Sequence, residues 1–512
     1  MLTLRGVALA RAPEDLVDIV IQCGKITDIR EAASTPRDGE IVDGEGRLAM
    51  AGFVDAHVHG EAALFDPDVQ LAMLRQGITT VVLGQDGVSF APTIDAPDTF
   101  EWATNYFTAI NGTHPSFSGG SVAQLLATYQ DLPVNTAFLA PHGTIRHAVM
   151  GGEQRSATRE EVAEMSQLLN HAFEQGACGI STGLEYAPSG YADRTELVEL
   201  TRIAKQYGLP HVSHMRGYEA KSAPAVEELV QIALTSGVKT HISHYHGPGD
   251  ELLTLIDDAH ARGVDLTFDS YPYLRGCSIL SMLTMPEWIP VTDPTKAVEM
   301  LRDSEIKQRL LTEHLPALGD VWPRVTLAAV PGKYQDVEGR RLVDLAAQWQ
   351  VSPAEAAIEL LANSALAVGA VFEQPPTNSA ESVAQLLRHP SHMGGSDAIY
   401  AGGHPHPRGW GAFAKFLADH VRSQGDWTWS EAENHLASAA SDRFKLNRGK
   451  VTPQAIADLS LIDPGAVTDR ATYDNPRQVA HGIDDVFIAG EHVLADGKLT
   501  GRTPGRAITN TP

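Results

Sequence analysis

Short apolar runs and amphipathic runs alternate through the middle of the chain. The apolar runs have the length and composition of buried strands, and they lie at residues 77–86, 134–143, 176–186, 209–215, 238–244 and 264–273. The segments between them have the pattern of helices. Thr158 and Glu161 form a capping-box pair before one of these helices, and Gly208 and Gly237 stand where two others should end. The pattern predicts strands that alternate with helices.

Two further runs bring the number of strand–helix units to eight. The segment "GFVDAHVHG" at 52–60 is the first predicted strand, and "SHMGGSD" at 391–397 is the last. Eight parallel strands with intervening helices indicate a TIM (β/α)8 barrel rather than an open doubly wound sheet. The stretch from about 276 to 390 is too long for a single loop, so we expect a lid or inserted subdomain there.

Both ends of the chain differ from the middle. They consist of short alternating runs separated by glycine turns, which is the pattern of strands in a small antiparallel sheet. Residues 1–50 and 450–512 are therefore expected to form one small β-sandwich domain, which leaves 51–449 for the barrel. The predicted fold class is α/β, a TIM (β/α)8 barrel with a small β-sandwich domain built from both termini.

Composition narrows the functional classes. The chain has 39 Lys and Arg against 64 Asp and Glu, a formal net charge of -25, which argues against binding to nucleic acid or to an anionic membrane. No run approaches the ~18 apolar residues of a membrane span. Cys23, Cys178 and Cys277 share no metal or disulfide spacing, which favours a reducing compartment. We expect a cytoplasmic protein with a small-molecule substrate, and a homo-oligomer is compatible with the sequence.

Groups that can bind a metal occur at the ends of the predicted barrel strands, where the active sites of such barrels lie. They are His57, His59, Asp86, His142, Glu185, His214, His244 and Asp397. A single histidine on an apolar strand is more often a satisfied core residue than a ligand, but core packing alone does not place such groups on successive strands. His57 and His59 are two apart, so their imidazoles point to the same side. We predict a zinc site, with Glu185 and Asp86 as candidates to bridge two ions.

The same positions resemble the amidohydrolase superfamily. Within it, seven segments look like those of the N-acyl-D-amino-acid deacylases, also called D-aminoacylases: "GLEYAPSGYAD", "APHGTIRHAVMG", "HISHYHG", "DSYPYLRG", "GGSD", "HPRGWGAF" and "ATYDNPRQVAHGIDDVFIAGEHV". The resemblance implies a zinc-dependent hydrolase that removes the acyl group from a D-amino acid by attack of metal-bound hydroxide on the amide carbonyl. It implies one or two zinc ions per chain, and we favour two.

The resemblance also implies roles for single residues. His57, His59, His214 and His244 would be metal ligands. Asp397 would bind metal or water, take the proton from the attacking water and deliver it to the leaving amine.

The substrate-binding residues follow from the same resemblance. Arg408 matches the arginine that pairs with the substrate's α-carboxylate, a task suited to the bidentate guanidinium. Tyr273 matches a second residue that binds this carboxylate. His142 and Arg146 match a segment that positions the substrate or supports the residues that do.

The chain departs from the family at three places. Asp86 stands where the family has a zinc-binding cysteine, and a carboxylate binds zinc less tightly than a thiolate does. Glu185 stands where other amidohydrolases carry a group that bridges two metals, so our hypothesis is a binuclear site bridged by Glu185 with Asp86 as an auxiliary ligand. His246 replaces a lysine, and Arg275 is the candidate to restore its charge or to read an acidic side chain. The acyl group and side-chain preference stay open.

Three other readings remain. A cyclic-amide hydrolase of the dihydroorotase or hydantoinase type usually has a carboxylated lysine where this chain has Glu185. A deaminase would leave the segment around Arg408 unexplained. A non-catalytic scaffold with this fold should have lost metal ligands and should purify without stoichiometric zinc.

Overall fold

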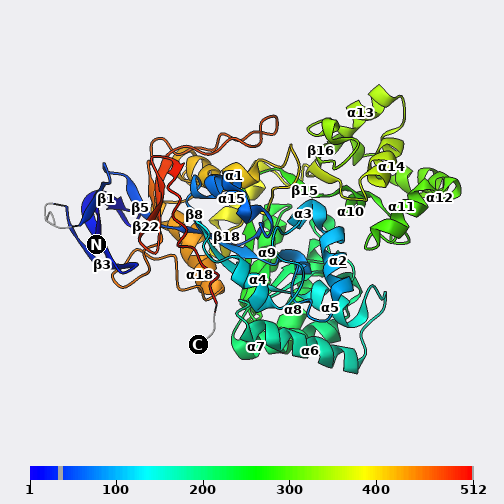
Figure 1. The fold of residues 1–512 in the computed structure, drawn as a ribbon, viewed down its shortest axis with the longest axis horizontal. Coiled ribbons are helices and arrows are strands. Elements are labelled where there is room, and N and C mark those ends of the chain that lie inside the picture. Colours follow the sequence, from blue (N-terminus) through cyan, green and yellow to red (C-terminus); the bar gives the residue numbers. More distant parts are fainter. Residues whose placement is uncertain (33–38, 510–512) are drawn as a thin grey trace.

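The computed structural model describes residues 1–32 and 39–509. Figure 1 shows three regions along its long axis: a sheet domain at the left, a barrel in the centre and an inserted subdomain at the upper right. No helix in the described part of the chain has both the length and the apolar character needed to cross a membrane.

The barrel consists of parallel strands that follow one another in chain order. They are β6 (Phe53–Asp55), β8 (Ile78–Leu83), β9 (Asn135–Phe138) continued by β10 (Ala140–Pro141), β11 (Ile180–Gly183), β12 (His211–His214), β13 (Thr240–Ile242), β14 (Leu266–Ser270) and β18 (His392–Gly394). The barrel closes where the Ala56 N–H donates to the Gly394 carbonyl at 3.1 Å. The predicted TIM barrel is confirmed, with strands shorter than the apolar runs suggested.

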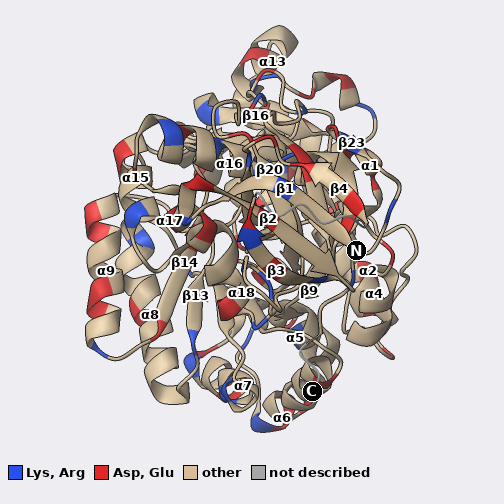
Figure 2. Ribbon diagram, turned by 90° about the vertical axis from the view of Figure 1, so that its left-hand side faces the viewer, with Lys and Arg blue, Asp and Glu red and all other residues tan. Residues whose placement is uncertain are grey.

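Helices surround this barrel. They are α1 (Pro67–Leu74), α2 (Pro97–Tyr106), α3 (Thr108–Asn111), α4 (Val122–Thr128), α5 (His142–Met150), α6 (Arg159–Glu174), α7 (Arg194–Tyr207), α8 (Ser222–Ser236), α9 (Gly249–Ala261), α15 (Ala380–Arg388), α16 (Arg408–Lys415), α17 (Trp429–Glu433) and α18 (Ala439–Arg443). The capping box of Thr158 and Glu161 opens α6, and Gly208 and Gly237 cap α7 and α8 with φ of 65° and 75°. Acidic residues recur along α9 on the outer surface (Figure 2).

Strands from both chain ends form one nine-stranded sheet. Its path is β23 (Lys498–Leu499), β22 (Glu491–Ala495), β21 (Ile483–Ile488), β20 (Leu459–Ile462), β5 (Leu48–Ala51), β1 (Leu2–Leu9), β2 (Ala12–Gln22) and β3 (Lys25–Glu31), with β4 (Glu40–Asp43) beside β1. β5 joins the two ends, since it pairs parallel with β1 and antiparallel with β20. A small sheet domain from both termini is confirmed, and its apolar residues share one core with the barrel.

The region between β14 and β18 forms a separate unit. A three-stranded antiparallel sheet, in the order β15 (Arg275–Ile279), β17 (Gly369–Glu373) and β16 (Val325–Ala329), packs with α10 (Leu280–Thr284), α11 (Pro294–Arg302), α12 (Ser304–Arg309), α13 (Leu342–Trp349) and α14 (Pro353–Asn363). This unit has its own apolar core, from Leu280 to Ala370. α15 packs instead against α9 and β14, so the barrel resumes inside the stretch that the sequence assigned to the insert.

Candidate metal centre

Six of the predicted ligands converge at the carboxyl ends of the barrel strands. His57 follows β6, His59 ends β7 (Val58–His59), His214 ends β12 and His244 follows β13. Asp86 lies in η2 (Gln85–Gly87) after β8, and Asp397 lies between β18 and β19 (Ala398–Ile399). All six side chains are buried. The strand ends therefore bring together four imidazoles and two carboxylates from segments up to 340 positions apart.

Asp86 occupies the centre of this cluster. Its Oδ1 lies 3.7 Å from His57 Nε2 and 3.8 Å from His244 Nε2. Its Oδ2 lies 3.6 Å from His59 Nε2 and 3.7 Å from His214 Nδ1. Each oxygen thus faces a different pair of histidines, which is the arrangement of a carboxylate that can bridge two cations.

Two overlapping groups in the cluster could each hold a metal ion, and His57 belongs to both. One consists of His57, Asp86 and His244, and the other of His57, His59 and Asp397. Within the described part of the chain, neither ring nitrogen of His57 has a hydrogen-bond partner, and neither does Asp86 Oδ1, although both residues are buried. Since buried polar atoms are nearly always satisfied, these atoms indicate that the cluster is built around a bound cation. The nitrogen and carboxylate donors fit zinc.

The backbone at the cluster is strained. Asp86, His244 and Asp397 have φ values of 56°, 37° and 50°, in the left-handed region that residues with a Cβ seldom adopt. Such conformations cost of order 1–3 kcal/mol and cluster at functional sites, where the surrounding structure enforces them. Three of the six candidate ligands therefore have a backbone conformation that the surrounding structure must enforce, and their side chains converge on the cluster.

The pKa values of several side chains in the cluster are shifted far from their ordinary values. Burial alone would lower the pKa of His57, but the carboxylates of Asp269, Asp86 and Asp397 outweigh it and raise the pKa to about 9. The pKa of His214 is likewise lowered by burial but raised overall to about 9 by Asp86 and Glu185. Burial opposes ionisation of Asp86, yet the facing histidines hold its pKa well below the usual value. Without a metal, these shifts favour protonated imidazoles at His57 and His214 and an ionised carboxylate at Asp86.

Asp269, on β14, supports the histidines from behind. It accepts hydrogen bonds from the His244 N–H at 2.8 Å and from His241 Nε2 at 2.9 Å, and its Oδ2 lies 3.6 Å from His57 Nδ1. The sequence analysis placed this residue within the predicted strand 264–273 but did not select it as a site residue. The signal was available, since Asp269 is a charged residue at the end of an apolar strand.

Glu185 lies at the edge of the cluster rather than within it. Its Oε2 is 3.0 Å from His214 Nε2, and its side chain is 39% exposed. It belongs to neither of the two candidate metal groups. Asp86, predicted as an auxiliary ligand, lies between the four histidines, and which carboxylate bridges two ions stays a prediction.

A cavity of about 560 Å³ opens over the cluster. His59, Asp86, Glu185, His214, His244 and Asp397 line its base, and Tyr271, His246 and Lys221 line its sides. Gly276, Cys277, Ser278, Met282, Leu283 and Phe372 close it from the insert. His246 is stacked on Tyr218, with ring centroids 4.9 Å apart, and burial lowers its pKa to about 4.

Three residues predicted to bind substrate do not line this cavity. Arg408 is fully buried, and its Nη1 lies 2.8 Å from Asp397 Oδ2. Tyr273 and Arg275 line a different cavity, where Arg275 pairs with Glu373 at 2.7 Å. Of the two tyrosines in the segment 271–273, Tyr271 lines the cavity over the cluster, as do Tyr186 and Tyr218 from other loops.

His142 is a fourth residue that the structure separates from the cavity. Its Nε2 lies 2.8 Å from Glu196 Oε1, and its Nδ1 lies 3.1 Å from Ser189 Oγ. Arg146 Nε donates to the same Glu196 carboxylate at 3.0 Å. All four side chains are buried, so His142 and Arg146 form a closed network with α7 rather than a surface for substrate.

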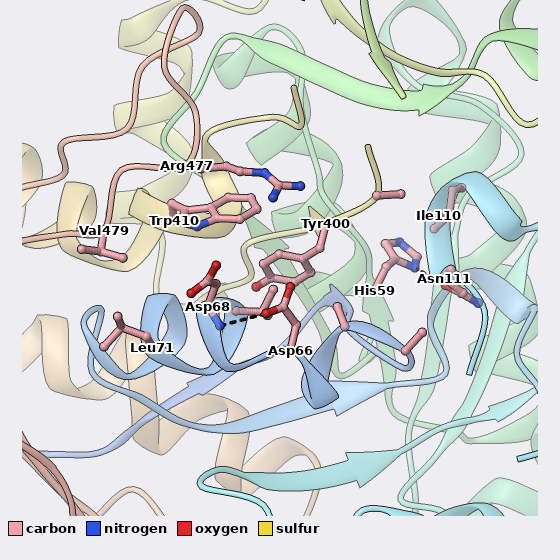
Figure 3. A pocket seen from close by; sticks show the side chains of 15 residues that line it. His59, Asp66, Asp68, Leu71, Ile110, Asn111, Tyr400, Trp410, Arg477 and Val479 are labelled. Carbon is pink, nitrogen blue, oxygen red and sulfur yellow. Dashed lines mark hydrogen bonds between the residues drawn. The ribbon is translucent and has the colours of Figure 1, made fainter. Parts of the chain in front are cut away.

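A second cavity, of about 430 Å³, lies beside His59 (Figure 3). Asp66 and Asp68, at the start of α1, face Tyr400, Trp410 and Arg477 across it. His59 lines both cavities, and its Nδ1 lies 3.2 Å from Asn111 Oδ1.

Comparison with known proteins identifies the family. The profile of the amidohydrolase family matches residues 40–500. An N-acyl-D-glutamate deacylase of Alcaligenes xylosoxydans xylosoxydans is 30% identical over 97% of this chain and 93% of its own length, and a D-aminoacylase of the same organism is 29% identical over 95% and 91%.

Solved structures give the same result. An N-acyl-D-glutamate deacylase from Bordetella bronchiseptica, complexed with zinc and a phosphonate inhibitor, has a TM-score of 0.81 at 27% identity and covers 99% of both chains. A D-aminoacylase has a TM-score of 0.82 at 28% identity, with the same coverage. The L-hydantoinase of Arthrobacter aurescens, at 14% identity and a TM-score of 0.57, shares the fold. The chain belongs to the amidohydrolase family.

Proposed function

We propose that this protein is a zinc-dependent hydrolase that cleaves the amide bond of N-acyl-D-amino acids to a carboxylate and a free D-amino acid. The observation that carries the proposal is the buried set of four histidines and two carboxylates, with polar atoms that lack partners, at the mouth of the barrel. The deacylases among the relatives support the substrate class.

The proposed ligands are the four histidines His57, His59, His214 and His244 with Asp86 and Asp397. When zinc is bound there, it polarises the amide carbonyl and lowers the pKa of water. We propose that Asp86 is the carboxylate shared by two ions, because its two oxygens face different histidine pairs. Glu185 then orients His214, to which it is hydrogen-bonded.

Asp397 is the proposed proton carrier. Burial would raise the pKa of its carboxyl, but the Arg408 guanidinium and the neighbouring histidines lower it below the usual value, so the group is ionised at neutral pH. An ionised carboxylate at the base of the cavity can take the proton from the attacking water and pass it to the leaving nitrogen.

Arg408 lies beside Asp397, and we keep its predicted role in binding the substrate carboxylate as part of the proposal. Its side chain is buried beside Asp397 and lies 4.7 Å from the centroid of the Tyr271 ring. Within the described part of the chain its Nε, Nη1 and Nη2 have no hydrogen-bond partner, which is the state expected of a guanidinium that binds a ligand anion. We propose that Arg408 orients Asp397 and keeps it ionised.

The insert is the proposed lid. Its strands β15 and β17 and its helix α10 provide the apolar wall of the cavity opposite the metal cluster. Limited proteolysis within residues 276–373 should slow when a ligand is bound, and a rate indifferent to ligand would contradict the lid. We keep a cytoplasmic location and a homo-oligomer as further proposals, the second to be checked by size-exclusion chromatography with light scattering.

The function is tested by measuring kcat/KM of the zinc-loaded enzyme on paired N-acetyl-D- and N-acetyl-L-amino acids with apolar, acidic and basic side chains. We expect turnover with a strong preference for the D series. Turnover of dihydroorotate or a hydantoin with no turnover of any N-acetyl amino acid would replace the proposal with a cyclic-amide hydrolase.

A further inference from the structure

A further cavity, of about 400 Å³, adjoins the cavity over the metal cluster. It lies between the loop after β11 and residues 281–292 of the insert, and we call it the side cavity. Glu185 and Met282 line both cavities, so these two side chains stand where the cavities meet. A volume of this size is enough for a small organic group.

The wall of the side cavity is largely apolar. Tyr106, Leu184 and Ile289 are buried there, and Met282 and Met285 are partly buried. Methionine is flexible and polarizable, so two methionines let the wall adapt to an apolar group. An apolar chain that enters the side cavity is removed from water, which favours its binding.

The charged side chains in this wall have protein partners, except Glu287, which is exposed. Arg216 Nε donates to Glu228 Oε2 at 3.0 Å, and Glu185 Oε2 lies 3.0 Å from His214 Nε2. Within the described part of the chain, no side chain in this wall has a buried polar atom without a hydrogen-bond partner. A charged ligand group would therefore be buried unpaired here, and the side cavity suits an uncharged apolar group.

The position of the side cavity indicates which end of the substrate reaches it. Glu185 follows β11, the fourth strand of the barrel, whereas Asp397 and the neighbouring Arg408 follow β18, the eighth. The fourth and eighth strands lie on opposite sides of an eight-stranded ring. In a trans amide, the acyl chain and the α-carbon point in opposite directions from the scissile bond. A substrate whose carboxylate lies at Arg408 therefore directs its acyl chain toward the side cavity.

We propose that the side cavity binds the acyl chain of the substrate, and that this enzyme prefers N-acyl-D-amino acids with linear apolar acyl chains longer than acetyl. The assignment rests on the proposed function, including carboxylate binding by Arg408. An acetyl group is too short to pass Met282, whereas a longer chain passes it and contacts the apolar wall.

The experiment measures kcat/KM of the zinc-loaded wild type on the acetyl, butanoyl, hexanoyl and octanoyl derivatives of one D-amino acid, chosen as the best substrate of the N-acetyl series. We expect kcat/KM to rise about two- to fourfold for each added methylene, mainly through KM, because each one is buried against the wall. The rise should stop when the chain reaches the exposed end of the side cavity at Glu287.

Two variants locate the effect. Met285→Trp and Thr292→Trp each place a large ring in the side cavity from a different point on its wall. Each should lower the ratio of kcat/KM for the octanoyl substrate to that for the acetyl substrate by about tenfold. Met300→Trp is the matched control and should keep the wild-type ratio. Like Met285, Met300 is a partly buried methionine packed against the core of the insert, but it lies on α11 and does not line the side cavity.

Zinc content and the thermal unfolding midpoint show whether each variant is folded with its metal site intact. A wild-type kcat/KM that stays constant or falls with chain length, while the acetyl substrate is cleaved, would overturn the acyl site and leave the proposed function standing. A rise that Met285→Trp and Thr292→Trp both leave unchanged would place the chain elsewhere and overturn the acyl site as well. Failure of the wild type to cleave any member of the series would overturn both proposals.

Discussion

Two buried clusters of histidine and carboxylate differ in whether their polar atoms have hydrogen-bond partners. In the network of His142, Glu196 and Arg146, polar atoms meet at hydrogen-bond distances of 2.8–3.3 Å. In the metal cluster, Asp86 faces four histidines at 3.6–3.8 Å, and His57 has no hydrogen bond from either ring nitrogen. His214 Nδ1 does lie 2.9 Å from His244 Nε2, so the difference concerns His57 and Asp86, whose distances leave room for an ion between them.

The difference shows how to tell a structural charged cluster from a functional one. Both consist of residues that are rarely buried without partners. The metal cluster lies at the ends of barrel strands, whereas the network of His142, Arg146 and Glu196 lies on α5 and α7. In the structural one, the side chains of His142, Arg146 and Glu196 bond to one another, and Arg146 also donates to the Glu153 and Arg155 carbonyls. None of these three residues has a left-handed backbone. The functional one has left-handed backbone at Asp86, His244 and Asp397 and unsatisfied donors and acceptors. The comparison predicts opposite responses to mutation, loss of chemistry in one and loss of stability in the other.

The largest expected effect is that of Asp397→Asn. The amide cannot accept a proton from the attacking water, so kcat should fall by about 10²- to 10⁴-fold while zinc remains bound. Asp496→Asn is the control, since Asp496 is an exposed aspartate with nearly the same backbone strain, φ 49° against 50°. Steady-state kinetics with metal analysis make the comparison, and a kcat within tenfold of the wild type would remove Asp397 from the proton path.

Glu196→Ala should act on stability instead. It leaves Arg146 and His142 buried without their carboxylate, which should cost about 3–5 kcal/mol of unfolding free energy. Urea unfolding of the zinc-loaded protein measures the loss, and kcat of the folded fraction should change little. Glu199→Ala on the exposed side of the same helix, where it pairs with Arg202, should stay within about 0.5 kcal/mol of the wild type. If Glu196→Ala lowered kcat of the folded protein and left the unfolding free energy unchanged, the network would serve the chemistry instead.

Removal of the metal should change stability through the metal cluster and leave the network around Glu196 unaffected. Zinc binds the folded chain, so at a free concentration about 1,000 times its Kd it should add about 4 kcal/mol to the unfolding free energy. Dialysis against a chelator should abolish activity and lower the unfolding midpoint, and returned zinc should restore both. The increment should persist in Glu196→Ala and disappear in His57→Ala. An unfolding midpoint indifferent to zinc would contradict a metal site at His57.

The smallest expected effect is the release of protons from the cluster when zinc binds. The pKa of His57 and of His214 lies near 9 in the metal-free protein, above the ordinary 6.5, so their protonation stabilises the metal-free fold fully below pH 6.5 and is lost as pH rises through 9. Zinc needs neutral imidazoles, so its binding at pH 7.5 should release about two protons. Calorimetric titrations in two buffers of different ionisation enthalpy count them, and no release would contradict these raised pKa values.

The sequence predicted the barrel and most of the cluster because both depend on local rules. His57 and His59 alternate on one strand, and the carboxyl ends of parallel strands lie at one mouth, so their convergence needed no knowledge of loop geometry. The nearly complete resemblance to the deacylases then pointed to the same residues.

The side-chain positions that differ from expectation depend on turns and strand pairing, which the local sequence does not determine. The central place of Asp86 depends on a left-handed turn after β8. Arg275 turns away from the cluster because the register of β15 and β17 sets it opposite Glu373, 98 positions along the chain. Tyr271 lines the cavity over the cluster and Tyr273 a different one, because the chain leaves β14 at Ser270 and turns between the two tyrosines, where the Tyr273 N–H donates to the Tyr271 carbonyl.

The pairing of β5 with β20 has a consequence for the growing chain on the ribosome. β5 is buried and apolar throughout, yet one of its edges is completed only by β20, which is made roughly 400 residues later. At translation rates of about 5–20 residues per second, that edge waits about 20–80 s for its partner. An apolar edge strand is a template for pairing with other chains. Nascent chains that stop before residue 459 should therefore aggregate or recruit chaperones, whereas completed chains should not.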